Sequence, residues 1–146
     1  MLVLPNRGRV LIEKLLDHTS DVGFVFVLMT PDDMGGTRQG FDHVVSTIAK
    51  HAYAPDWLDV VHKSFKPRVR QNVMFEYGLC ISSLGRERVR VLLGKDPRLG
   101  DLEIPSDVLG YGHISFEHSV SECEEEIKRE LQAADYEIAE KSPTDE

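Results

Sequence analysis

One glutamate lies on the border between an apolar and a polar helix face in the stretch RQNVMFEYG, residues 70–78. At about 100° per residue, the apolar residues of this stretch and its flanks form one stripe. Glu76 falls at the edge of that stripe, beside Asn72 one turn earlier. Partial burial disfavours the charged form of a carboxyl group, and such groups often act as acids, bases or stabilisers of a transition state. A structural glutamate that reaches from the border into water also explains the spacing.

Polar residues follow the most apolar run of the chain. The run Val22–Met29 is rich in Val and Phe, as expected for a central parallel strand that is covered on both faces. Thr30, Asp32 and Asp33 come directly after it. Ligands of open parallel sheets bind outside the carboxyl ends of the strands, so these three side chains are candidates for binding. A simple Asx-type turn accounts for the two aspartates equally well.

Two short basic clusters are candidates for contacting a pyrophosphate. One contains Arg7 and Arg9, and the other runs from Lys66 to Arg70. Short basic clusters also occur simply because they keep a surface soluble. The aromatic residue beside the border glutamate, Phe75, is a candidate face for a nicotinamide or adenine ring, although aromatic residues more often pack in a core.

Strand and helix patterns alternate along the chain. Residues 8–17, 69–84 and 119–137 have helical periodicity, residues 88–93 and 113–116 read as strands, and Gly85 is a natural helix end. Residues 34–66 read as an irregular insert with one or two helices, near 41–50 and 56–63. This order predicts an α/β fold with a parallel sheet and helices on both faces. We expect one domain over residues 1–138 and a disordered acidic tail over residues 139–146.

Composition excludes several classes of protein. Apolar residues make up 41% of the 146 positions and no run is long enough to span a bilayer. Residues 117–146 hold 11 acidic and 3 basic residues, which argues against a nucleic-acid-binding surface there. Two cysteines suggest a reducing compartment, with the cytoplasm as the default. The six histidines lack the spacing of a metal site, so we expect no metal.

Several segments together resemble a known family. The runs RQNVMFEYGLCISSLGRERVRVLL and EIPSDVLGYGHISF, with the upstream PNRGRVLIEKL and SDVGFVFVLMTPDD, are similar to the TIR-like domains of bacterial predicted nucleotide-binding proteins. Such domains occur in CD-NTase-associated effectors, including TIR-STING fusions. Several motifs in register are more specific than any short pattern.

The resemblance implies a flavodoxin-like sheet and an NAD⁺ nucleosidase. The helical glutamate of the family's N-V-x-F-E-x-G pattern is catalytic, and that role falls on Glu76. The segment Pro5–Arg9 corresponds to the BB loop, which contacts neighbouring subunits and borders the nucleotide. The implied partners are therefore NAD⁺, as substrate rather than cofactor, and further copies of the chain in a homo-oligomer.

The chain departs from the family at its start. The usual domain has a strand, a loop with Gly, His and Ser, and a helix before the strand that ends in PNRGR, whereas here Met1 comes immediately before that strand. We therefore expect an N-terminally truncated domain, or a sheet completed through another copy of the chain. Two other functions remain open: an enzyme like the nucleoside deoxyribosyltransferases, and a non-catalytic TIR-like module that binds a nucleotide or assembles with partners.

Overall fold

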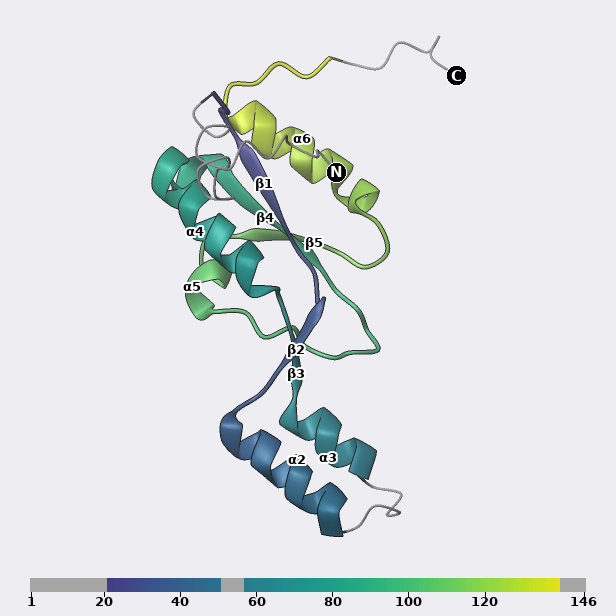
Figure 1. Ribbon diagram of the computed structural model, residues 1–146. Helices are drawn as coiled ribbons and strands as arrows, with labels where there is room; N and C mark the ends of the chain where they lie inside the picture. The colour runs from purple at the N-terminus through teal and green to yellow at the C-terminus, as the bar shows by residue number, and fades with distance from the viewer. Residues whose placement is uncertain (1–20, 51–56, 140–146) are drawn as a thin grey trace, which may run out of the picture.

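Three parallel strands form the centre of the protein. The computed structural model describes residues 21–50 and 57–139. The strands are β1 (Val25–Met29), β4 (Val89–Gly94) and β5 (His113–Phe116), in the order β1-β4-β5 (Figure 1). The register pairs Val25 with Val89 and Leu92 with Ile114. Their carboxyl ends therefore meet at one edge of the sheet, as the α/β prediction requires.

Helices cover both faces of this sheet. On one face, valines from β1 and β4 pack against Tyr77 and Cys80 of α4 (Gln71–Leu84) and Val108 of α5 (Ser106–Leu109). On the other face, Leu92, Ile114 and Phe116 pack against Cys123 and Ile127, from the 3₁₀ turn η2 (Val120–Cys123) and from α6 (Glu124–Ala133). β1 and β4 thus divide their side chains between two cores, because successive residues point to opposite faces. β5 contributes Ile114 and Phe116 to the second core only.

The predicted elements agree with the structure at most of their bounds. The last strand has the predicted limits, and α4 ends at Gly85, whose φ of 79° suits glycine and whose N–H donates to the Ile81 carbonyl. A further 3₁₀ turn, η1 (Arg86–Arg88), leads into β4. The final helix is shorter than predicted, since the chain leaves it at Ala134 and Asp135 takes a positive φ. The predicted helix near residues 8–17 and residues 140–146 of the predicted tail lie outside the described residues.

The insert is more regular than the sequence suggests. Strands β2 (Asp33–Gly35) and β3 (Lys66–Arg68) form a two-stranded antiparallel ribbon, which carries α2 (Arg38–Lys50) and α3 (Trp57–Ser64). We refer to residues 33–68 as the arm. In Figure 1 the two helices of the arm lie away from the three-stranded sheet, at the far end of the ribbon. The ribbon therefore sets the position of the helices relative to the sheet.

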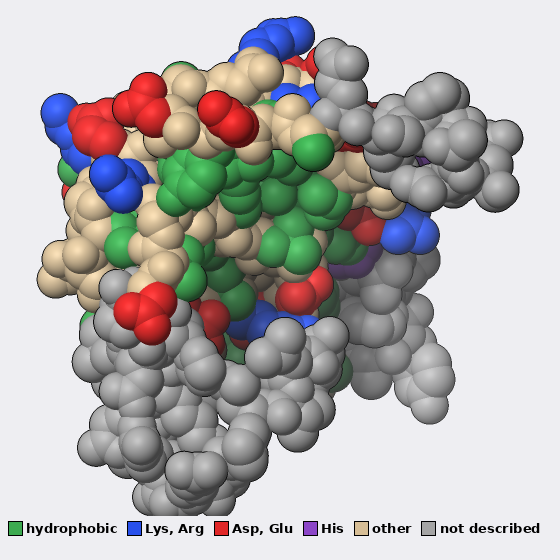
Figure 2. All heavy atoms as spheres, turned by 90° about the horizontal axis from the view of Figure 1, so that it is seen from above, with side chains coloured by type: hydrophobic (Ala, Val, Ile, Leu, Met, Phe, Trp, Pro, Cys, Tyr) green, Lys and Arg blue, Asp and Glu red, His purple; other side chains and the backbone are tan. Residues whose placement is uncertain are grey.

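Apolar surface remains exposed on the molecule. Figure 2 shows hydrophobic side chains gathered in the middle of the face seen from above, with acidic and basic side chains around them. Leu28 and Tyr136 are examples of large apolar residues that stay substantially exposed. Apolar patches with a polar rim are typical of surfaces that contact another molecule.

Met29 provides a test of the two-core arrangement. Its side chain is 0% exposed, whereas the neighbouring Leu28 is 47% exposed. We expect Met29→Ala to lower the free energy of unfolding by about 2–5 kcal/mol, because it leaves a cavity in the core. The control Leu28→Ala costs about 1 kcal/mol, since only part of that side chain is removed from water. Urea unfolding of both variants measures the difference, and equal costs would contradict the assignment of faces.

Glu122 provides a test at acidic pH. Its carboxylate accepts the backbone N–H groups of Glu117, His118 and Ser119 at 2.9–3.0 Å, which holds the pKa of Glu122 below its usual range. The resulting stabilisation is present above the unfolded pKa, near ~4.3, and is lost as the pH falls through the lower folded pKa. We expect Glu122→Gln to flatten the acid side of a urea-midpoint curve. Parallel curves for wild type and variant would rule out this role.

Candidate functional site

The end of β1 and the start of α4 meet in a small polar cluster. Thr30 Oγ1 donates a hydrogen bond to Asp32 Oδ2 at 2.9 Å, and Arg70 Nε lies 3.5 Å from the same oxygen. The Asp32 N–H also donates to the Thr30 carbonyl, so the loop is closed on itself. Three of the predicted binding residues are therefore brought together from two segments that are far apart in sequence. Arg70 and Asp32 remain about half exposed, so the cluster is open to solvent.

Thr30 also packs against the neighbouring strand. A Cβ placed on Gly94 would lie 2.9 Å from Thr30 Cγ2 and 3.0 Å from Phe116 Cζ. Glycine at this position therefore lets the loop after β1 close over the ends of β4 and β5. This contact fixes Thr30 relative to the sheet edge.

Asp33 does not join this cluster. It is the first residue of β2 and stands opposite Arg68 of β3 in the ribbon register. The sequence predicts it as a strand-end neighbour of Asp32, but the chain turns into the ribbon at this point. Asp33 is exposed at the base of the arm.

The face of α4 next to its buried stripe carries the candidate glutamate. Tyr77 and Cys80 are buried, as the helical wheel predicts, and Glu76 is half-buried beside them. Asn72 lies one turn before Glu76 and is exposed. Among the described residues, Glu76 forms no hydrogen bond and no ion pair. It is thus a partly desolvated carboxylate on a helix that the core holds in place.

Phe75 is not a core residue. Its side chain is 52% exposed, although aromatic residues more often pack in a core. The reason is that α4 is apolar on more of its circumference than the sheet can cover, and Tyr77 takes the buried position. An aromatic ring therefore lies on the solvent side of the helix, one residue before the candidate carboxylate.

The pKa of the Cys80 thiol depends on its burial and on the nearby Glu76 carboxylate. Burial, and then the nearby Glu76 carboxylate, raise the pKa of Cys80. A thiol of this kind stays protonated and is a poor nucleophile. The candidate chemistry of this helix therefore lies with the carboxylate.

A cavity of about 490 Å³ lies at the carboxyl ends of the strands. Its lining includes Pro31 after β1, Lys95 after β4 and Glu117 after β5, with an apolar side formed by Leu93 and Leu109. Glu76 is not among its lining residues. The polar residues after β1 predict a ligand edge here, but the sequence does not single out Lys95 or Glu117, because the loops after β4 and β5 are less distinctive.

The basic cluster after the insert is divided between two places. Arg70 faces the Thr30 and Asp32 loop, whereas Lys66 and Arg68 line a second cavity of about 850 Å³ at the base of the arm. Arg68 Nε lies 2.5 Å from Glu103 Oε2, a carboxylate that follows β4. This ion pair links the ribbon to the segment that follows β4. The residues of one basic stretch therefore lie on two separate surfaces.

Two of the predicted binding residues lie outside the described ranges. Arg7 and Arg9 belong to the segment that the structure does not describe. Within residues 21–50 and 57–139, no cluster of three or more His, Cys, Asp or Glu is arranged to hold a metal. No helix in the described part of the chain is long and apolar enough to cross a membrane.

Comparison with known proteins identifies the family. The family described as CAP12/Pycsar effector protein, TIR domain, matches residues 4–118. The chain is 37% identical over 106 residues to the uncharacterized protein YuaY of Escherichia coli (strain K12), covering 73% of this chain and 26% of YuaY. It is 31% identical over 124 residues to Protein tirC of Dictyostelium discoideum, covering 84% of this chain and 53% of tirC.

The chain therefore spans about a quarter and about half the length of these two curated relatives. No solved structure gives a significant match. The parallel sheet with helices on both faces, the order of the elements and the match over residues 4–118 agree with one another, and the chain belongs to the family of CAP12/Pycsar effector TIR domains.

Proposed function

We propose that this chain is an NAD⁺ nucleosidase of the TIR type, which cleaves the bond between nicotinamide and ribose as the effector part of an antiphage-type system. The proposal combines the family with one observation, the half-buried Glu76 that has no partner among the described residues. A carboxylate in a salt bridge would have to break that bond before serving a substrate. Glu76 has no such salt bridge to break among the described residues, and its position in α4 restrains its backbone.

The chemistry requires little beyond one carboxylate. As the glycosidic bond breaks, its electron pair leaves with the pyridinium nitrogen, which becomes neutral nicotinamide, and positive charge develops on the ribose. A carboxylate close to the anomeric carbon or the ribose hydroxyls stabilises this charge. Water then adds to the anomeric carbon and loses a proton, which gives ADP-ribose. No general acid is needed, because the nicotinamide leaves as a neutral molecule.

The neighbours of Glu76 suggest how the substrate binds. Asn72 lies one helical turn away and offers an amide to the ribose hydroxyls, and the exposed ring of Phe75 offers a face to nicotinamide. Arg70 is half exposed at the start of the same helix and offers a guanidinium to the pyrophosphate. The Thr30 and Asp32 loop holds Arg70 at that end. By the resemblance, Arg7 and Arg9 of the BB loop border the same nucleotide.

Assembly is part of the proposal. Within the described residues, β1 pairs with β4 along one edge and has no strand on the other. The apolar surface with its charged rim in Figure 2 provides area for contact with a second copy. We therefore propose that the chain acts as a homo-oligomer, and that activity depends on protein concentration.

Glu76→Gln tests the catalytic assignment. The change keeps the shape of the side chain and removes its charge, so we expect the rate of nicotinamide release from NAD⁺ to fall about 10²–10³-fold. Glu87→Gln, an identical change at an exposed position beyond the end of α4, leaves the rate unchanged. The assay is run on purified protein, with and without a crowding agent that favours assembly.

Each outcome of this assay decides between the candidate functions. Nicotinamide release that survives Glu76→Gln removes Glu76 from the mechanism. Base release from deoxyadenosine, without release from NAD⁺, favours the deoxyribosyltransferase-like reaction. If neither substrate releases its base with or without the crowding agent, but NAD⁺ still binds, the non-catalytic module is favoured.

Arg70→Ala tests the binding role separately. Loss of a charged hydrogen bond to a phosphate weakens binding by about 10-fold or more. We expect the KM for NAD⁺ to rise by that factor with kcat nearly unchanged, since the pyrophosphate is remote from the bond that breaks. Arg86→Ala removes the same charge near the other end of α4 and is the matched control. A fall in kcat at constant KM would show that Arg70 does not act by binding the substrate.

A further inference from the structure

The base of the arm contains a cavity that the proposed reaction does not use. It measures about 850 Å³ and is lined by the end of β2, the first turns of α2, the end of α3 and β3. Its volume lies within the range of small-molecule sites. Neither Glu76 nor Arg70 is among its lining residues. The cavity is therefore a separate place in the fold, next to the ribbon.

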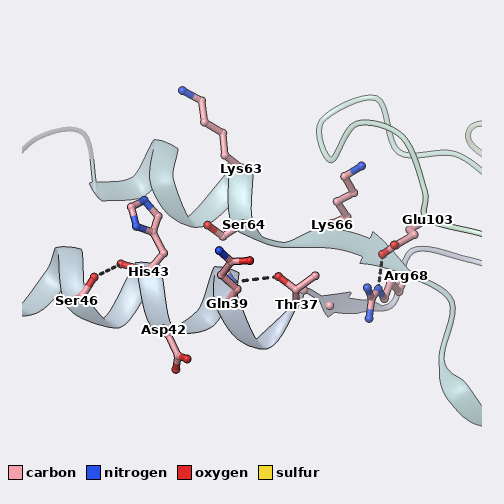
Figure 3. Close-up of a pocket in the computed structure, with 13 residues that line it drawn as sticks. Thr37, Gln39, Asp42, His43, Ser46, Lys63, Ser64, Lys66, Arg68 and Glu103 are labelled. Atoms are coloured by element: carbon pink, nitrogen blue, oxygen red, sulfur yellow. Dashed lines mark hydrogen bonds and ion pairs between the residues drawn. The ribbon is translucent and has the colours of Figure 1, made fainter.

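Two lysines add positive charge to the lining of this cavity. Lys63 lies in the last turn of α3 and Lys66 begins β3, and in Figure 3 both side chains extend to the same side of the arm. Neither forms a hydrogen bond or an ion pair with any residue in the described part of the chain. An ammonium group is a point charge that commonly binds phosphate, and two in one cavity suit a ligand with at least two negative charges.

The acidic residues of the lining are already engaged or turned away. Glu103 is paired with Arg68, as described above. Asp42 lies 3.9 Å from Arg38 Nε, and Figure 3 shows its carboxylate pointing to the side of α2 opposite the two lysines. The hydrogen bond from Arg68 and, to a smaller extent, the charge of Lys66 hold the pKa of Glu103 below its usual range. With three basic and two acidic side chains, the lining still has an excess of positive charge, although the whole chain carries a net charge of −8.

Neutral polar side chains also line the cavity. Gln39, His43 and Ser64 are drawn between the two helices in Figure 3. The first turn of α2 is not the source of the attraction, because Thr37 Oγ1 already accepts the Gly40 N–H at 3.0 Å. The site therefore consists of side chains from both helices, and its anion affinity depends on the lysines.

Glycine makes the close approach of α2 and α3 possible. A Cβ on Gly36 would lie 2.4 Å from the Ser64 carbonyl oxygen, and one on Gly40 would lie 3.2 Å from the same atom. The first position excludes any side chain without a shift of the backbone. The two glycines thus bring the start of α2 against the segment that carries Lys63 and Lys66.

We propose that the base of the arm binds a phosphate-bearing small molecule with at least two negative charges, through Lys63 and Lys66. Gln39 and Ser64, which lie between the two helices, and the remaining volume accommodate the rest of the ligand. The site is distinct from the Glu76 region and stands whether or not the chain cleaves NAD⁺.

The probe for this site is inorganic pyrophosphate, measured by isothermal titration calorimetry with the whole chain at low ionic strength. We expect saturable binding to wild type that weakens as salt is added, because exposed charges are screened. Lys63→Ala/Lys66→Ala lowers the affinity at least about 10-fold. Lys63→Arg/Lys66→Arg restores most of it, and an unchanged thermal melt for each variant shows that the fold is intact.

Matched controls separate a site from general charge. Lys50→Ala/Arg129→Ala also removes two positive charges from the surface, at exposed positions that neither line the cavity nor pair with a lining residue, and leaves the affinity within about 3-fold of wild type. Glu76→Gln leaves pyrophosphate binding unchanged, so failure of the nucleosidase proposal is distinguishable from failure here. Absence of saturable binding, equal loss in both double variants, or equal affinity for citrate each overturns the proposal.

Discussion

Burial of α4 against β1 and β4 is the constraint on which the rest of this structure depends. Tyr77 and Cys80 pack into the same core as Val27 and Val91, and this contact fixes the rotation of the helix about its axis. Once the buried stripe is fixed, every other residue of α4 has a set position relative to the sheet. Glu76 is then held at the boundary between core and solvent, where a carboxylate is partly desolvated without being enclosed. The candidate chemistry is thus a consequence of helix packing.

The same helix links the sheet to the arm. Only Val69 and Arg70 separate the end of β3 from the first residue of α4, so the ribbon and the helix share one short connection. That connection is anchored on both sides, since the Glu103 N–H donates to the Pro67 carbonyl at 2.8 Å and Arg70 faces Asp32. A rearrangement of the ribbon therefore reaches the start of α4 directly. The arm cavity and the Glu76 region are separate sites on one continuous stretch of backbone.

Charge is distributed to match this division. The last 30 residues carry most of the acidic excess, and α6 covers the sheet face opposite α4 with Glu124, Glu125 and Glu126 in its first turn, where negative charge favours a helix. Lys63 and Lys66, which have no ion-pair partner in the described chain, lie instead on the arm. An anionic ligand that approaches the molecule is therefore repelled by the acidic C-terminal region and attracted to the lysines of the arm.

The class of fold and the central elements can be predicted from the amino-acid sequence alone. An apolar run of Val and Phe, a helical stripe that ends at Gly85 and a short last strand carry strong periodic signals, because each buries a regular face. Three features depend instead on how the chain packs: Asp33 belongs to a ribbon, Phe75 is exposed, and Lys66 and Arg70 lie on different surfaces. The ribbon pairs two short, mostly polar strands across the whole arm, so no local pattern marks it. Side-chain exposure on α4 depends on how much of the helix the sheet can cover, which is a property of packing and not of spacing.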